Sequence, residues 1–172
     1  MNRGFAPIAA TDARVLILGS FPSQRSLDVG QYYAHPQNSF WFIIERLFAR
    51  QTGLSYTARA ELLMRAKVAL WDVLHAADRP GSLDSAIVTG SEIPNDFGTF
   101  LARHHAIHTI FFNGAKAQAL FEKHVAGIME SDSALRFVRL PSTSPANAGT
   151  TRERKLELWR EAIQTAQSLL CI

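Results

Sequence analysis

The sequence predicts an α/β fold: a three-layer α/β/α sandwich around a short, mainly parallel four-stranded sheet. Two observations carry this prediction. Apolar runs alternate along the chain with segments of helical periodicity, and each apolar run stops at glycine, proline or asparagine or at a polar stretch. Such alternation requires right-handed crossovers, which cover both faces of a parallel sheet with helices. The 172 residues suffice for a sizeable core, and we expect one domain over residues 1–172.

Four apolar segments are the predicted strands. They are short and rich in β-branched and aromatic residues, as strands of a buried sheet are. They cover residues 14–19, 68–71, 107–112 and 135–140.

The predicted helices have apolar residues at spacings of three and four, which indicates one core-facing side. They cover residues 39–50, 58–65, 93–103 and 115–125, and a last helix opens at Thr150 or Thr151. Pro94 suits a first helical turn, and Glu153 stands three residues after Thr150 as in a capping box. The core-facing residues of the last helix are Leu156, Trp159, Ile163, Ala166 and Leu170.

Composition narrows the class of protein. Charged residues make up 19% of the chain, and no apolar run approaches the roughly 18 residues of a membrane span. The first residues lack the apolar core of a signal peptide, so we expect a cytoplasmic protein. The single cysteine, Cys171, excludes an intrachain disulfide, an iron–sulfur cluster and a cysteine-rich zinc site. The histidines show no metal-ligand spacing, and the net charge of +3 permits a nucleic-acid partner without requiring one.

The stretch Val15–Trp41 is the predicted centre of function. Its apolar strand stops at Gly19-Ser20-Phe21-Pro22, and a loop rich in rings and amides leads into the next helix. Strand, loop and helix in this order place a ligand beyond the carboxyl end of a parallel strand. The strand ends at Asn113-Gly114 and Pro141–Ser144 should meet this loop along one rim of the sheet.

These segments resemble motifs of the uracil-DNA glycosylase superfamily. Gly19-Ser20-Phe21-Pro22 followed by Tyr33-Ala34-His35-Pro36-Gln37-Asn38-Ser39-Phe40-Trp41 resembles its first motif. Leu140-Pro141-Ser142-Thr143-Ser144 stands where the second motif is found, and Phe111-Phe112-Asn113-Gly114 where the base-reading strand ends. The resemblance runs from about residue 12 to residue 170 and is strongest to the hypoxanthine-DNA (deoxyinosine) glycosylases, with similarity to the mismatch-specific uracil/thymine glycosylases. It implies an α/β/α DNA repair enzyme without metal or cofactor.

Two positions depart from the superfamily pattern, and they shift the expected catalytic residue. Phe21 stands where members usually have Asp or Asn, and Leu140 where the second motif usually starts with His or Asn. The hypoxanthine branch is similar in lacking the first of these groups, and it relies on the asparagine of its HPxN segment. By that resemblance Asn38 is the predicted catalytic residue. Its amide could hold water at the oxocarbenium-like transition state, although an asparagine before an apolar helix is also a good N-cap.

The expected base-binding residues are Gly19, Ser20, Phe21, Tyr33 and Asn113. A flipped base is held by stacking, which Tyr33 or Phe21 could supply, and by its hydrogen-bonding edge, which the Asn113 amide could read. Each has a structural alternative. Tyr33 and Phe21 could be packing residues, and Asn113 before a glycine could serve a turn.

The expected DNA-binding residues lie in and after the second motif. Ser142, Thr143 and Ser144 offer hydroxyls and backbone amides to phosphate. Arg152, Arg154 and Lys155 stand in the first turns of the last helix, where the helix N-terminus also favours anions. The alternative for these three charges is a solvated helix face.

The predicted function is that of a monofunctional, monomeric DNA glycosylase. It would hydrolyse the N-glycosidic bond of a flipped deaminated base in DNA, hypoxanthine first and uracil second. Hydrolysis without strand cleavage is expected because no lysine is placed in the first-motif loop to form a Schiff base. Two other functions remain open: a hydrolase of free nucleosides or nucleotides, and a non-catalytic DNA-binding module in which Phe21 and Leu140 mark lost catalysis.

Overall fold

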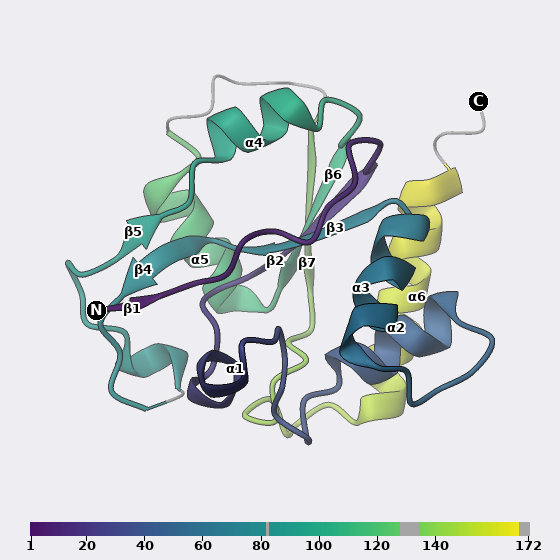
Figure 1. Ribbon diagram of the computed structural model, residues 1–172, viewed down its shortest axis with the longest axis horizontal. Helices are drawn as coiled ribbons and strands as arrows, with labels where there is room; N and C mark the ends of the chain where they lie inside the picture. The colour runs from purple at the N-terminus through teal and green to yellow at the C-terminus, as the bar shows by residue number, and fades with distance from the viewer. Residues whose placement is uncertain (82, 128–134, 169–172) are drawn as a thin grey trace.

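The computed structural model describes residues 1–81, 83–127 and 135–168. Its centre is a parallel sheet of four strands in the order β3–β2–β6–β7 (Figure 1). The strands are β2 (Val15–Gly19), β3 (Val68–Asp72), β6 (Thr109–Asn113) and β7 (Arg136–Leu140). All four run in one direction, so their last residues lie along one edge. The predicted sheet is confirmed.

Helices cover both faces of the sheet, which confirms the three-layer architecture. Figure 1 shows α2, α3 and α6 packed on one side and α4 and α5 on the other, and α1 follows β2 beyond the edge of the sheet. The helices are α1 (Gln24–Val29), α2 (Phe40–Phe48), α3 (Tyr56–Arg65), α4 (Phe97–Arg103), α5 (Ala115–His124) and α6 (Arg152–Ser168).

The apolar run of β2 is explained by burial on both faces. Leu16 and Leu18 pack with the aromatic side chains of α4 and α5. Val15 and Ile17 point the other way and pack with those of α2 and α6. Alternate residues of one strand therefore serve two separate cores.

A second, antiparallel sheet was not predicted. It has the order β1–β4–β5, with β1 (Asn2–Arg3), β4 (Leu74–Ala77) and β5 (Ile93–Pro94), and a 3₁₀ turn, η1 (Asp84–Ala86), lies between β4 and β5. The predicted helix over residues 93–103 is therefore wrong in its first part. Pro94 sits on an edge strand, where its missing N–H costs nothing. The helix starts at Phe97 because the Asp96 carboxylate caps it by accepting from the Thr99 N–H at 3.0 Å.

The last helix departs from its prediction at its cap and at one residue of its buried side. The Thr151 hydroxyl accepts from the Arg154 N–H at 3.2 Å, so Thr151 and not Thr150 caps α6. Trp159, Ile163 and Ala166 are buried as expected, whereas Leu156 is only partly buried against the same core. Leu170 and Cys171 lie outside the described residues. In the described ranges, no helix combines the length and apolarity that crossing a membrane requires.

Candidate functional site

Two loops meet beyond the carboxyl ends of the strands. The first loop, residues 20–39, follows β2, and the second loop, residues 141–151, follows β7. The Ser39 N–H donates to the Thr143 carbonyl at 3.0 Å and joins them. Asn113 at the end of β6 donates through its amide nitrogen to the Thr143 hydroxyl (2.9 Å) and accepts the Thr143 N–H at its oxygen (2.8 Å). The expectation that three distant strand ends meet at one rim is confirmed.

Asn38, the predicted catalytic residue, lies at this junction. Its side-chain oxygen accepts the Phe40 N–H at 2.9 Å, and its own N–H donates to the His35 carbonyl at 2.9 Å. The first bond resembles the capping role that the sequence left open, although α2 itself follows Ser39. The bond from the Phe40 N–H engages the amide oxygen of Asn38 and thereby fixes the direction in which its amide NH₂ group points.

Tyr33 and Gly19 lie together at the end of β2. Tyr33 is half-buried, adopts a left-handed backbone conformation (φ 53°) and stacks on the Phe40 ring with centroids 4.1 Å apart. A Cβ atom at Gly19 would collide with both the Tyr33 hydroxyl and the carboxylate of Asp72 at the end of β3. Glycine is therefore required here by the close approach of two polar groups.

Ser20 and Phe21 are packed into the fold. Phe21 is 5% exposed in the core on the α4–α5 side, and the Arg79 guanidinium lies 5.1 Å from its ring centroid. Arg79 also donates to the carbonyls of Pro22 and Gly81 and so braces the turn after β2. Ser20 is buried, and its carbonyl accepts the Leu74 N–H. Phe21 therefore has the core position that the sequence left open as an alternative to stacking.

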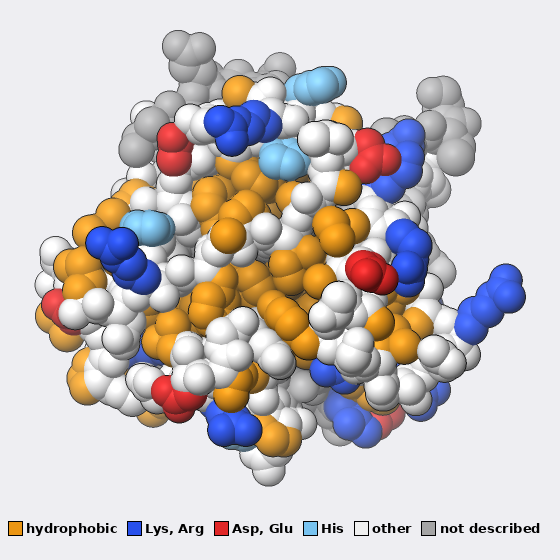
Figure 2. Space-filling model, viewed as in Figure 1, with side chains coloured by type: hydrophobic (Ala, Val, Ile, Leu, Met, Phe, Trp, Pro, Cys, Tyr) orange, Lys and Arg blue, Asp and Glu red, His pale blue; other side chains and the backbone are white. Residues whose placement is uncertain are grey.

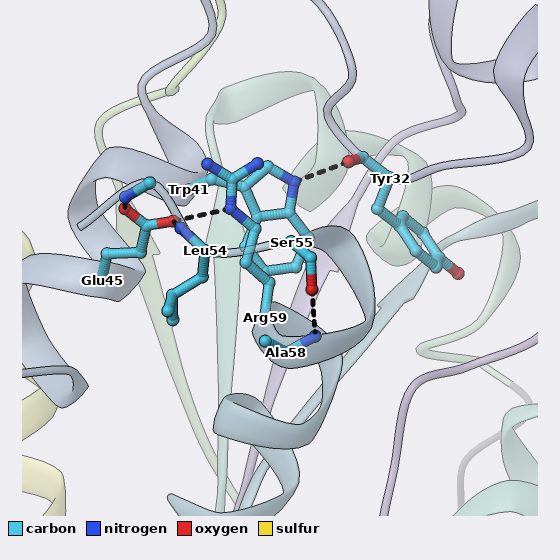
Figure 3. Close-up of polar contacts among 8 residues, drawn as sticks. Tyr32, Trp41, Glu45, Leu54, Ser55, Ala58 and Arg59 are labelled. Atoms are coloured by element: carbon cyan, nitrogen blue, oxygen red, sulfur yellow. Dashed lines mark hydrogen bonds and ion pairs between the residues drawn. The ribbon is translucent and has the colours of Figure 1, made fainter. Parts of the chain in front are cut away.

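Side chains from α2 and α3 fix the backbone ahead of Tyr33. The Tyr32 N–H donates to the Tyr56 hydroxyl at 3.1 Å. The Trp41 indole N–H donates to the Tyr32 carbonyl at 2.7 Å, as Figure 3 shows. Burial and then the negative charge of Asp72 raise the pKa of Tyr32 above its usual value. Tyr32 is thus a neutral residue whose backbone and side chain anchor the aromatic part of the first loop.

A buried carboxylate supports Trp41 from behind. Glu45 accepts from Arg59 Nε at 2.7 Å and from the N–H groups of Gly53 and Leu54, and the Arg59 guanidinium lies over the Trp41 ring (Figure 3). Burial alone would raise the pKa of Glu45. The hydrogen bonds outweigh this effect and hold that pKa below its usual value, so the group stays ionised.

The second loop contains the residues expected to bind DNA. Ser142 and Ser144 are half-buried, Arg152 is exposed with its guanidinium 4.0 Å from the Phe42 ring centroid, and Thr143 is 0% exposed. In this conformation the Thr143 hydroxyl cannot reach a phosphate, because it is enclosed with Asn113. Thr143 instead fixes the loop that presents its neighbours.

A buried lysine braces the second loop from below. Lys155 in the first turn of α6 donates through Nζ to the carbonyls of Asn147 (2.9 Å) and Ser144 (3.3 Å), and burial lowers its pKa. The Trp159 indole N–H donates to the Pro141 carbonyl at 3.0 Å. The loop is therefore held mainly through its backbone.

Sequence reasoning missed Asp72. Asp72 directly follows the apolar run of β3, and a carboxylate at a predicted strand end was the signal that could have found it. Lys155 was expected to contact DNA or to lie on a solvated helix face, and both expectations are wrong because its side chain is buried and bonded to the second loop. Among the residues that the structure describes, no group of three or more His, Cys, Asp or Glu is arranged to hold a metal ion.

On the face of the molecule that Figure 2 shows, lysines and arginines form no broad basic patch. Figure 2 shows hydrophobic side chains gathered across the middle of that face, with lysines and arginines toward its margin. The two loops at the strand ends therefore remain the candidate site.

The fold and the candidate site define an α/β domain whose two loops, one rich in rings and the other in hydroxyls, lie beyond the ends of parallel strands, where such domains place ligands. The chain belongs to the Uracil DNA glycosylase superfamily, whose model matches residues 6–166. The predicted family is confirmed, and with it the enzyme class of DNA glycosylases.

Relatives agree over nearly the whole chain. Hypoxanthine DNA glycosylase of Methanosarcina acetivorans is 33% identical over 158 residues, which cover 91% of this chain and 95% of the relative. Hypoxanthine DNA glycosylase of Methanosarcina barkeri is 31% identical over 164 residues, covering 95% and 98%. A solution NMR structure from M. acetivorans, described as a candidate uracil DNA glycosylase, has a TM-score of 0.77 at 31% identity and covers 96% of this chain and 98% of its own.

Proposed function

We propose that this protein is a monofunctional DNA glycosylase that releases deaminated bases from DNA, hypoxanthine first and uracil second. The names of the two relatives support hypoxanthine as the first substrate. The observation that carries the proposal is the position of Asn38, oriented by Phe40 at the junction of the two loops. We take residues 1–172 to act as one domain and as a monomer.

The role of Asn38 follows from the chemistry of its amide. Water adds to C1′ of the deoxyribose, the bond to the base breaks with its electron pair going to the base, and the proton lost by water leaves to solvent. The transition state is oxocarbenium-like, so it needs positioned dipoles more than a strong base. With its oxygen on the Phe40 N–H, the Asn38 side chain has N–H donors for the attacking water or a sugar oxygen.

The other predicted residues are assigned around this centre. Tyr33, stacked on Phe40, lies where a flipped base would be held. Ser142, Ser144 and Arg152 contact phosphate, while Asn113 and the enclosed Thr143 keep the second loop in place. Gly19, Ser20 and Phe21 form the turn beneath the base.

Hydrolysis without strand cleavage is supported by the environment of Lys155. A Schiff base needs an amine that can reach C1′. Lys155 is buried beneath the second loop and donates to two of its carbonyls, so its amine is held in a structural role.

The test is base excision from end-labelled oligonucleotides with one deoxyinosine or one deoxyuridine, single-stranded and opposite each base, with alkali to reveal abasic sites. Asn38→Ala should slow single-turnover excision on the order of 100-fold, the size of effect seen when a transition-state donor is removed, without weakening DNA binding. Gln37→Ala, an exposed neighbour in the same loop, should leave both quantities unchanged.

Each alternative has its own outcome in this experiment. Strand cleavage without alkali would contradict the monofunctional mechanism. Release from free deoxyinosine but not from DNA would select a nucleoside hydrolase. DNA binding without release, equal for wild type and Asn38→Ala, would leave only a binding module.

A further inference from the structure

Asp72 is a buried carboxylate at the edge of the sheet that the proposed mechanism does not use. It is the last residue of β3 and only 3% exposed. Its backbone is held from two directions. It is paired in register with Gly19, and its carbonyl accepts from the Asn95 amide nitrogen at 2.8 Å. The next residue, Val73, donates its N–H to the Gly19 carbonyl at 2.9 Å. The side chain therefore starts from a fixed point.

The Asp72 carboxylate lies over Gly19, at the β3 end of the row of strand ends that forms the candidate site. A Cβ atom at Gly19 would collide with a carboxylate oxygen of Asp72 and with the Tyr33 hydroxyl, so both groups occupy the space above this glycine. The negative charge of Asp72 also contributes, after burial, to the raised pKa values of Tyr32 and Tyr56. The charge thus acts on the aromatic part of the first loop.

The place beside Asp72 already accommodates a flat ring. Tyr33 stacks on Phe40 with centroids 4.1 Å apart and an interplanar angle of 26°, and it brings an O–H group to the space above Gly19. An aromatic ring with a hydrogen-bond donor on its rim therefore fits between Phe40 and the carboxylate. Asn113, the predicted reader of the base edge, has its amide engaged with Thr143 at both ends.

We propose that the Asp72 carboxylate selects deaminated bases by accepting the N–H of their lactam edge, in the place that the Tyr33 ring now occupies. This inference rests on the proposed function. Hypoxanthine and uracil each present a ring N–H beside a carbonyl, whereas adenine and cytosine present an unprotonated ring nitrogen with a lone pair. An ionised carboxylate only accepts hydrogen bonds, so it binds the first edge and repels the second. Binding adenine or cytosine here is costly because the carboxylate is buried, so water cannot supply the hydrogen bond that the base does not donate.

The test compares wild type and Asp72→Asn on two purines in otherwise identical DNA. One duplex carries deoxyinosine, and the other carries 2′-deoxynebularine, whose purine base has a ring nitrogen lone pair in place of the N–H. Asp72→Asn keeps the shape, removes the charge and replaces one of the two acceptor oxygens by an N–H donor. The preference for hypoxanthine over purine in single-turnover excision should fall by at least about 10-fold, a factor within the range that loss of one buried hydrogen bond causes.

Controls separate recognition from folding. Binding to a duplex with a tetrahydrofuran abasic analogue should be unchanged in Asp72→Asn, because no base is present. Asp12→Asn changes an exposed aspartate that pairs with Lys67 near the opposite end of β2, and it should leave rate, preference and binding as in wild type.

A second arm uses wild type alone, so it holds even where Asp72→Asn fails to fold. Deoxy-1-methylinosine lacks the N–H, and its base should be released at least about 10-fold more slowly than hypoxanthine. Equal release of these two bases, or an unchanged preference in a folded Asp72→Asn, overturns the role of Asp72 and leaves the glycosylase proposal standing. Absence of any release by wild type overturns the proposed function itself.

Discussion

The first and second loops lie side by side, but they differ in the size of their side chains and in the groups that hold them. The first loop is held by large side chains. The Trp41 indole N–H and the Tyr56 hydroxyl form hydrogen bonds with the backbone of Tyr32, and the Phe40 ring stacks on Tyr33. The second loop consists of small residues, and Lys155 and Trp159 hold it through its carbonyls.

The difference matches the two things a DNA glycosylase must hold. A flipped base is a flat apolar ring with a polar edge, and aromatic side chains suit it. A phosphate is bound by hydroxyls and backbone N–H groups, which a loop of small residues can expose. Variants that loosen one loop and spare the other test this division.

The largest effect is expected from Glu45→Ala, which removes the support behind the first loop. The substitution leaves the Nε–H of Arg59 and the backbone N–H groups of Gly53 and Leu54 without their acceptor. We expect the free energy of unfolding in urea to fall by about 3 kcal/mol. Base release should slow as well, because Trp41 and Tyr32 lose their support.

Glu61→Ala is the matched control for this variant. Glu61 forms an exposed i,i+4 pair with Arg65 on α3, with 3.7 Å between the charged atoms. Its loss should cost less than about 0.5 kcal/mol. Equal losses for the two variants would show that the network behind the first loop does not brace it.

A smaller effect is expected from Lys155→Met, which acts on the second loop. Methionine keeps the packing of the aliphatic stem but cannot donate to the carbonyls of Ser144 and Asn147. We expect the free energy of unfolding to fall by about 1–2 kcal/mol as a result. The dissociation constant for DNA should rise, while the rate of base release from saturated enzyme stays as in wild type.

Arg154→Met removes the same charge from the same end of α6. Arg154 is exposed and pairs with Glu157. The excess effect of Lys155→Met over Arg154→Met on DNA binding therefore measures bracing rather than charge. If the two variants bind DNA equally, bracing by Lys155 is refuted.

The smallest effect lies outside both loops, at Glu92 before β5. A hydrogen bond from Lys123 Nζ (3.0 Å), helped by the Gly90 N–H, lowers the pKa of Glu92 from 4.5 to about 2. Because the folded-state pKa lies below the unfolded one, the ionised pair stabilises the fold above about pH 4.5 and loses this contribution as the pH falls toward 2.

Glu92→Gln should therefore lower stability by about 1 kcal/mol at pH 6, a modest value because Lys123 is half exposed. The difference from wild type should vanish near pH 2, as measured by thermal unfolding across the pH range. Base release should not change at neutral pH. A stability difference that persists at pH 2 would assign the effect to packing instead of charge.

Sequence patterns predicted the main sheet because its strands are apolar runs with clear ends. They failed for β5 and α1, two and six residues long, because such short elements have no periodicity to detect. Asn38 was predicted as the catalytic residue only through its motif. Asp72 was missed because its place beside Gly19, a residue far away in the sequence, is known only from the register of β2 and β3.

The contact between Asn113 and Thr143 also escaped prediction. Each residue was expected to face a ligand, since each is polar and stands at a strand end. In the fold they satisfy one another, because an amide and a threonine with its backbone N–H form two complementary hydrogen bonds. A sequence shows polar groups but not which of them are already partnered.

The order of the main sheet also bears on solubility. In the described part of the chain β7 pairs on one side only, and Phe137 on this strand is 49% exposed. An open strand with an exposed ring can add a strand from another molecule and seed aggregation. Arg136 and Arg139 lie exposed on the same strand, and the opposite margin of the sheet is covered where Ile8 bridges to Leu70. Charge at one margin and chain at the other thus oppose edge-to-edge pairing of copies of the sheet.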